Sequence, residues 1–197
     1  MIERYICGTK YEDFLIRVEE FHGYRSPGIL LGGIMLDISL REMEPAPYLN
    51  VVSETVVCLP DAVQLLTPCT IGNGFLQILD WGKFALTGYD RVTLSGVRMW
   101  LNHYKLSDYP LIRAWFERTG QPKEKPPFEE LAAEILNAGE DLILCRPVKL
   151  HHALKDSTPV PTGLCPRCGE SYPLRFGSAC PSCNGEAYYD FQNSFGV

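Results

Sequence analysis

Apolar residues in the first 43 positions recur at the spacing of α-helices. In residues 11–21, Phe14, Leu15 and Val18 share one side and charged residues occupy the other, which predicts an amphipathic helix. The pair Ser26-Pro27 is typical of a helix start, so a second helix is predicted from there to about residue 43. That helix is mostly apolar and contains several glycines, which indicates that another backbone or a bound group approaches it closely.

The hydrophobic period then changes to that of β-strands. Alternating segments rich in β-branched residues predict strands at residues 49–57, 75–79, 83–89, 95–101 and 141–150. Further helices are predicted at residues 60–66, 107–118 and 128–137. Because helices and strands do not alternate regularly, the order predicts an α+β fold, with a mixed or antiparallel sheet and flanking helices.

Length and composition divide the chain into a main domain and an appendage. The 197 residues suit one α+β core domain, residues 1–155, followed by a proline-rich hinge and a small module, residues 162–197. Hydrophobic residues make up 46% and charged residues 21%, the composition of a globular protein with a real core. No apolar run reaches the length of a membrane span, and the N-terminus lacks a signal core, so we expect a cytoplasmic protein.

Four cysteines carry the strongest chemical signal in the sequence. Cys165, Cys168, Cys180 and Cys183 form two Cys-x-x-Cys pairs with eleven residues between them. Soft thiolates in this number and spacing are typical of a closed, structural zinc site, because each pair aims two sulfurs at one point. Two disulfides or a redox dithiol are the alternatives, which an unexported chain disfavours. The net charge of −6 argues against a nucleic-acid partner, since phosphates need basic residues.

Three loops upstream carry a histidine or a cysteine at the end of a predicted element. They hold His22, Cys58 and Cys69. Imidazole and thiolate are ligands of an open transition-metal site, and thiols at helix N-termini often have a lowered pKa. The alternative is that the cysteines are small buried hydrophobes, an interpretation we favour for Cys7 and Cys145.

The ordered motifs of residues 11–150 resemble those of the FmdE-like family of formylmethanofuran dehydrogenase components. The matching residues are Phe21-His22-Gly23 with Pro27-Gly28, then Cys58, Asp61, Ala62 and Gln64, then Cys69-Thr70 with Gly72 and Gly74, and then Asp80 with Gly82-Lys83. The resemblance implies an α+β core that is often a dimer, and in some members a C-terminal treble-clef zinc finger. It also implies membership of a larger dehydrogenase complex, whose molybdenum or tungsten pterin belongs to a different polypeptide.

Two positions depart from the family pattern. Members commonly have a second histidine and a cysteine where this chain has Tyr24 and Ser26. A core metal, with zinc the best chemical match, would therefore have fewer than four protein ligands and an open position.

Three functions remain open on the sequence. The first is a metal-binding accessory protein of molybdenum or tungsten metabolism, with a structural zinc and a second metal in a core cleft at His22, Cys58 and Cys69. The second is a small enzyme in which Cys58 or Cys69 is a nucleophile or metal ligand, Asp61 or Asp80 a base, and Lys83 an anion contact. The third is an interaction module that docks a partner through its zinc finger.

Overall fold

The computed structural model describes residues 3–43, 47–118, 126–154 and 159–190. Two compact units are present, Met1–Lys155 and Asp156–Val197, and each is described by itself. Part of the proline-rich hinge and the last residues of the chain lie outside the described residues. No helix among the described residues is long and apolar enough to cross a membrane.

A five-stranded sheet forms the centre of the first unit. Its strands are β3 (Leu49–Ser53), β4 (Leu76–Ile78), β5 (Ala85–Asp90), β6 (Ser95–Leu101) and β7 (Ile143–Lys149). They lie in the order β4-β3-β5-β6-β7, with β3 and β4 parallel and every other pair antiparallel. The predicted mixed sheet of an α+β fold is therefore confirmed.

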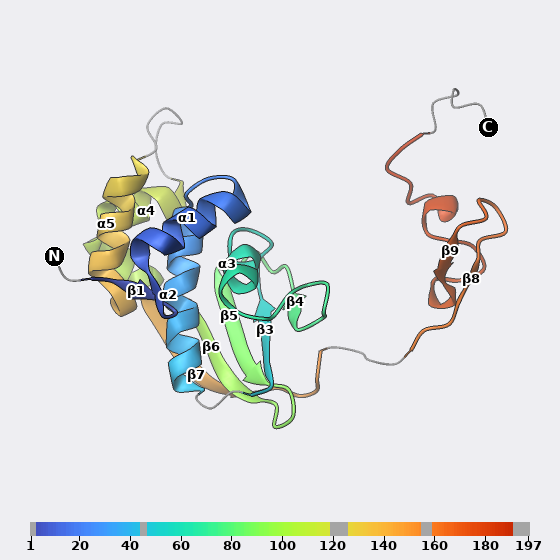
Figure 1. The fold of residues 1–197 in the computed structure, drawn as a ribbon, viewed down its shortest axis with the longest axis horizontal. Coiled ribbons are helices and arrows are strands. Elements are labelled where there is room, and N and C mark those ends of the chain that lie inside the picture. The colour runs from blue at the N-terminus through green and yellow to red at the C-terminus, as the bar shows by residue number, and fades with distance from the viewer. Residues whose placement is uncertain (1–2, 44–46, 119–125, 155–158, 191–197) are drawn as a thin grey trace. The chain divides into compact units, whose positions relative to one another are not determined.

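Helices flank this sheet. They are α1 (Tyr11–His22), α2 (Pro27–Glu42), α3 (Leu59–Leu66), α4 (Pro110–Glu117) and α5 (Phe128–Ala138), and a short hairpin of β1 (Tyr5–Ile6) and β2 (Thr9–Lys10) precedes them. The apolar helix α2 packs against β5 and β6 and is buried over most of its length (Figure 1). This burial explains why α2 has no polar stripe, unlike α1.

The glycines of α2 allow neighbouring elements to approach it closely. A Cβ atom added at Gly28 would lie 2.7 Å from Cys58 Sγ, and one added at Gly32 would lie 2.8 Å from the Cβ of Ala62. Both neighbours belong to the start of α3, so these glycines set the distance between the two helices. The close approach predicted from the glycines is present, and its partners are side chains.

Several element boundaries differ from those predicted. The strand predicted at residues 49–57 ends at Ser53, whose hydroxyl donates to the Thr55 carbonyl oxygen across a turn. The helix predicted at residues 107–118 begins only at Pro110, after a 3-10 turn, because proline fixes the first helical position. Cys145 is exposed rather than buried, since it lies on β7 at the edge of the sheet.

The second unit is small and has little core of its own. Its hairpin pairs β8 (Thr162–Leu164) with β9 (Ser171–Pro173), and two 3-10 turns follow at Leu174–Phe176 and Ser182–Asn184. Tyr172 and Ala179 are its only buried hydrophobic residues besides cysteines, within the described part of the unit. So few apolar contacts cannot hold a fold together without further support.

Candidate functional site

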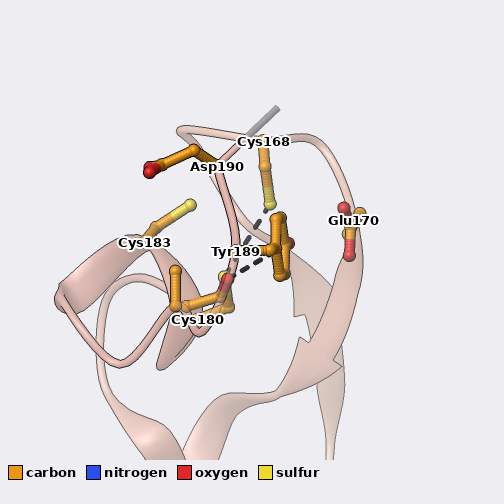
Figure 2. A pocket seen from close by; sticks show the side chains of 8 residues that line it. Cys168, Glu170, Cys180, Cys183, Tyr189 and Asp190 are labelled. Carbon is orange, nitrogen blue, oxygen red and sulfur yellow. Dashed lines mark hydrogen bonds between the residues drawn. The ribbon is translucent and has the colours of Figure 1, made fainter. Parts of the chain in front are cut away.

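The four C-terminal cysteines converge on one point. Cys165 and Cys168 lie in the turn between β8 and β9, Cys180 lies just before the last 3-10 turn, and Cys183 lies within it. One ligand atom from each lies within 4.8 Å of all the others, and the sulfurs of Cys168, Cys180 and Cys183 are visible in Figure 2. The Cys168 and Cys180 sulfurs are 3.8 Å apart, too far for a disulfide. Four thiolates at a Zn–S distance of about 2.3 Å would lie about 3.8 Å apart in a tetrahedron.

Backbone amides and the sulfurs themselves set the proton affinities at this site. The Cys180 amide donates to the Cys165 sulfur at 3.5 Å and, with other amides, lowers the pKa of Cys165 to about 6. A hydrogen bond with Cys180, followed by burial, raises the pKa of Cys183 to about 12. The crowded sulfurs therefore favour a mixture of thiol and thiolate, and a cation between them is needed to hold all four as thiolates.

The geometry and ligand types fit a structural Zn²⁺. All four positions of a tetrahedral ion would be filled by cysteine, which leaves none for water or substrate. Arg167 connects the two Cys-x-x-Cys pairs, because it lies in the first pair and its guanidinium donates to the Cys183 carbonyl oxygen in the second. The site is suited to holding the module together and has no open position for catalysis.

In the first unit, His22 and Asp61 are brought together. His22 ends α1 and Asp61 lies in the first turn of α3, and His22 Nδ1 is 2.7 Å from a carboxylate oxygen of Asp61. A carboxylate accepts hydrogen bonds, so Nδ1 carries the proton and Nε2 keeps its lone pair in the neutral ring. That Nε2 atom is buried and has no hydrogen-bond partner within the described residues. The ring of Tyr24 lies 4.6 Å from the His22 ring.

Cys58 occupies a strained turn directly before α3. Its φ and ψ are 58° and −48°, and the Leu59 amide donates to the Val57 carbonyl oxygen at 2.6 Å. These values describe a γ-turn of the rare, strained kind. The Cys58 sulfur lies 3.4 Å from the Ser26 hydroxyl oxygen at the start of α2. Burial raises the pKa of Cys58, which is the opposite of the lowered pKa expected from its place at a helix N-terminus.

Cys69 is placed differently from Cys58. It follows the C-terminal end of α3, is fully buried, and its thiol donates to the Leu49 carbonyl oxygen at 3.4 Å. The eight residues of α3, about 12 Å of helix, separate it from Cys58. Of all the His, Cys, Asp and Glu side chains in the described ranges, only the four C-terminal cysteines place three or more ligand atoms together. The structure thus joins His22 with Asp61 and leaves Cys69 in the core.

Two further residues named from the sequence lie on an exposed loop. Lys83 Nζ is 5.2 Å from the centre of the Trp81 ring, and Asp80 accepts a hydrogen bond from the Gly82 amide. Sequence reasoning missed the bidentate pair of Glu54 and Arg98 beneath this loop. The two residues are 44 positions apart, so no spacing rule could have joined them.

Two family models match this chain. The family model described as "FmdE, Molybdenum formylmethanofuran dehydrogenase operon" matches residues 21–150. The chain belongs to the FmdE family. A second model, the FmdE treble clef zinc finger, matches residues 158–190 and so covers the four converging cysteines. Both parts of the resemblance seen in the sequence motifs are confirmed.

One solved structure and one further relative are similar to this chain. A crystal structure of a tungsten formylmethanofuran dehydrogenase FmdE-like protein from Syntrophus aciditrophicus is 39% identical, with a TM-score of 0.85 over 96% of this chain and 100% of that one. A protein of Archaeoglobus fulgidus, named "Probable S-adenosyl-L-methionine-binding protein", is 27% identical over 90% of this chain. This FmdE-family chain spans only 58% of that relative's length.

Proposed function

We propose that this FmdE-family chain is a metal-binding accessory protein of molybdenum or tungsten enzyme metabolism. The four converging sulfurs are the observation that carries the proposal. They fit a structural zinc in a module that has almost no apolar core. The link to molybdenum and tungsten rests on the names of the family and of the Syntrophus relative.

The proposal includes a second, open metal site at His22 and Cys58. The Asp61 carboxylate orients the imidazole and leaves Nε2 as a buried lone pair without a partner among the described residues. Cys58, which directly precedes the helix that carries Asp61, would supply a thiolate. Water would complete the coordination of a zinc ion because Tyr24 and Ser26 replace the family's other ligands. Cys69 is left out of this site, since its buried thiol donates a hydrogen bond to the Leu49 carbonyl oxygen.

Elemental analysis of protein purified without chelator tests the proposal. The intact chain should carry about two zinc ions per molecule when saturated, one of them exchangeable. Replacing His22 or Cys58 by Ala should remove the exchangeable ion and leave the other bound. Cys145→Ala is the matched control, because Cys145 is an exposed residue of β7 that belongs to neither proposed ligand set. A stoichiometry that neither His22→Ala nor Cys58→Ala changes would remove the second site from the proposal.

A small thiol- or metal-dependent enzyme is the second candidate. The strained turn at Cys58 and the His22–Asp61 pair favour it, because strain and an oriented imidazole often occur at reactive cysteines. S-adenosyl-L-methionine, which the Archaeoglobus relative's name gives as its ligand, is the first small molecule to test by titration calorimetry. Selective alkylation of Cys58 that His22→Ala slows would support the enzyme. Equal alkylation rates in the intact chain and in His22→Ala would argue that His22 does not activate the Cys58 thiol.

The assembly and location also belong to the proposal. We infer a homodimer that works in the cytoplasm and joins a larger dehydrogenase complex, on the basis of the family resemblance. Light scattering at micromolar concentration should give about twice the monomer mass of 22.2 kDa. A mass equal to that of the monomer would contradict the dimer.

A further inference from the structure

The face of the sheet that points away from α2 carries a hollow with a polar floor. Gly88 on β5 faces α2, since an added Cβ would lie 2.2 Å from Ser39 Oγ. Neighbouring residues on a strand point to opposite faces, so Thr87 points away from α2. Val52, Thr87 and Arg98 are paired across β3, β5 and β6 and form a row on this second face. The hollow above them has a volume of about 340 Å³, the size of a small-molecule pocket.

The walls of this hollow are mainly apolar, and Trp81 lies on its rim. Leu79, Leu150 and Leu154 contribute to the walls. Trp81 is 60% exposed, and its amide donates to the Glu54 carbonyl oxygen at 3.0 Å. The loop that carries the indole is therefore held in place while the ring remains accessible. Such a ring offers a planar apolar surface at low conformational cost.

A buried ion pair fixes a guanidinium on the floor. Glu54 is only 3% exposed, and its two carboxylate oxygens accept from Nε and Nη2 of Arg98, each at 2.7 Å. This arrangement leaves both N–H groups of Nη1 without an acceptor within the described part of the chain. Arg98 also stacks on Trp100, with 5.1 Å between the guanidinium carbon and the ring centre. A guanidinium held on two sides has little rotational freedom left to lose when a ligand binds to its free edge.

The basic and N–H-bearing side chains around the hollow favour an anionic ligand. The Lys83 ammonium lies over Trp81 at the rim, and the imidazoles of His151 and His152 are exposed beside it. Lys149 also lines the hollow, but its ammonium group bonds to the Thr93 carbonyl oxygen and the Ser95 hydroxyl. The one carboxylate in the lining, Glu54, forms a neutral pair with Arg98. The net positive charge therefore comes from Lys149 and Lys83, and Arg98 contributes its free N–H groups.

We propose that this hollow binds a small planar aromatic or heteroaromatic acid. The ring of the ligand packs between Trp81 and the leucines, and its anionic group accepts hydrogen bonds from Nη1 of Arg98. No residue of this site belongs to the zinc module or to the His22–Asp61 pair. The failure of one proposal would therefore leave the other standing.

Dye binding to the full chain tests the proposal with two matched probes. The anionic dye 1-anilinonaphthalene-8-sulfonate should bind once per chain with saturable fluorescence, and more tightly than N-phenyl-1-naphthylamine, which lacks the sulfonate. Trp81→Ala should weaken the binding of both dyes by about threefold to tenfold, which is the change in affinity expected when one aromatic contact is lost. Arg98→Lys retains a positive charge beside Glu54 but removes the fork of donors, so it should abolish the preference for the anionic dye.

The control is Tyr104→Ala, which removes an aromatic side chain that is 89% exposed and does not line the hollow. It should leave both affinities unchanged. Non-saturable dye binding, or equal affinities in Trp81→Ala and the intact chain, would overturn the pocket. Equal binding of the two dyes to the intact chain would overturn its preference for acids. Assigned indole N–H resonances give an independent readout. That of Trp81 should shift on titration with 2-naphthoate, and that of Trp115, which packs against Phe84 and does not line the hollow, should not.

Discussion

Two cysteines with similar sequence surroundings have different environments in the fold. Cys58 lies in a strained γ-turn beside Ser26, and Cys69 is a buried thiol bonded to a strand carbonyl. Burial is the largest cause that raises the pKa of each, so both are protonated at neutral pH. Backbone conformation distinguishes the two residues more than acidity does, because only Cys58 has a positive φ.

Replacing Cys58 by Gly should destabilise the protein less than replacing it by Ala. Glycine adopts positive φ readily, whereas alanine keeps the strain and also loses the thiol. We expect Cys58→Gly to be more stable by about 1 kcal/mol in urea unfolding. At Cys69, where φ is not positive, the order should reverse and Ala should be the more stable variant. If Ala were the more stable variant at both positions, the turn at Cys58 would store no strain.

Cys7 should make the stability of the first unit fall at alkaline pH. Burial, with a smaller contribution from Asp37, raises its pKa from 9.0 to about 12. Above pH 9 the unfolded chain loses this proton while the folded chain keeps it, so unfolding is favoured as pH rises towards 12. By pH 11 the intact protein should lose about 1–3 kcal/mol relative to a Cys7→Ser variant, which has no thiol to ionise.

Urea unfolding at pH 8 and pH 11 measures this difference. Cys145→Ser, at an exposed position on β7, is the control and should follow the intact protein at both values. A Cys7→Ser variant that loses stability in parallel with the intact protein would exclude Cys7 as the cause.

At the scale of elements, the contact between α2 and α3 determines where the candidate core site lies. The glycines of α2 bring α3 close enough for Cys58 to reach Ser26, and the end of α1 places His22 against Asp61. The site therefore depends on three helices that are all packed on the same hydrophobic core. Helix packing sets the positions of the proposed metal-ligating side chains, which the sequence supplies at the ends of the helices.

Gly32→Ala should separate the two helices and lower stability. The new methyl group would lie 2.8 Å from the Ala62 Cβ and 3.0 Å from a methyl carbon of Leu59. Overpacking of this kind costs about 1–3 kcal/mol, partly offset by a helix propensity gain of about 1 kcal/mol. Gly72→Ala, whose added Cβ would have nothing closer than 4.0 Å, should be neutral or slightly stabilising. Urea midpoints that do not differ between the two variants would contradict this account of the helix contact.

At the scale of the whole molecule, the two units are stabilised by different interactions. The first unit buries an extended cluster of apolar side chains, and the second buries only a few residues around its cysteines. A small unit of this kind obtains much of its folding free energy from its metal. The two units should therefore respond separately to chelation.

A strong chelator should unfold the C-terminal module and leave the first unit folded. In ¹⁵N–¹H spectra, resonances from the described residues 159–190 should collapse to random-coil positions while those of the sheet remain. Cys180→Ser should produce the same spectrum without chelator, because three thiolates cannot close the tetrahedral site. Cys145→Ser should leave the spectrum dispersed. A module that stays folded without metal would show that its few apolar contacts are sufficient.

The sequence by itself determined the features that depend on neighbouring residues. Hydrophobic period, turn residues and proline positions gave the existence of the main helices and of the strands, with errors mainly at their ends. The predicted strand at residues 95–101 has the bounds of β6, Ser95–Leu101. The zinc cysteines could be named because each pair is local and the ligand geometry of zinc constrains its spacing.

The tertiary structure decided which distant residues meet. Cys58 and Cys69 could be grouped on the sequence, but the length of α3 separates them, and the pairing of His22 with Asp61 depends on how α1 packs against α3. The buried pair of Glu54 and Arg98 likewise forms only when β5 pairs with both β3, which Glu54 follows, and β6, which carries Arg98. Packing, burial and hydrogen-bond partners arise from contacts between residues far apart in the chain, and a local pattern contains no information about them.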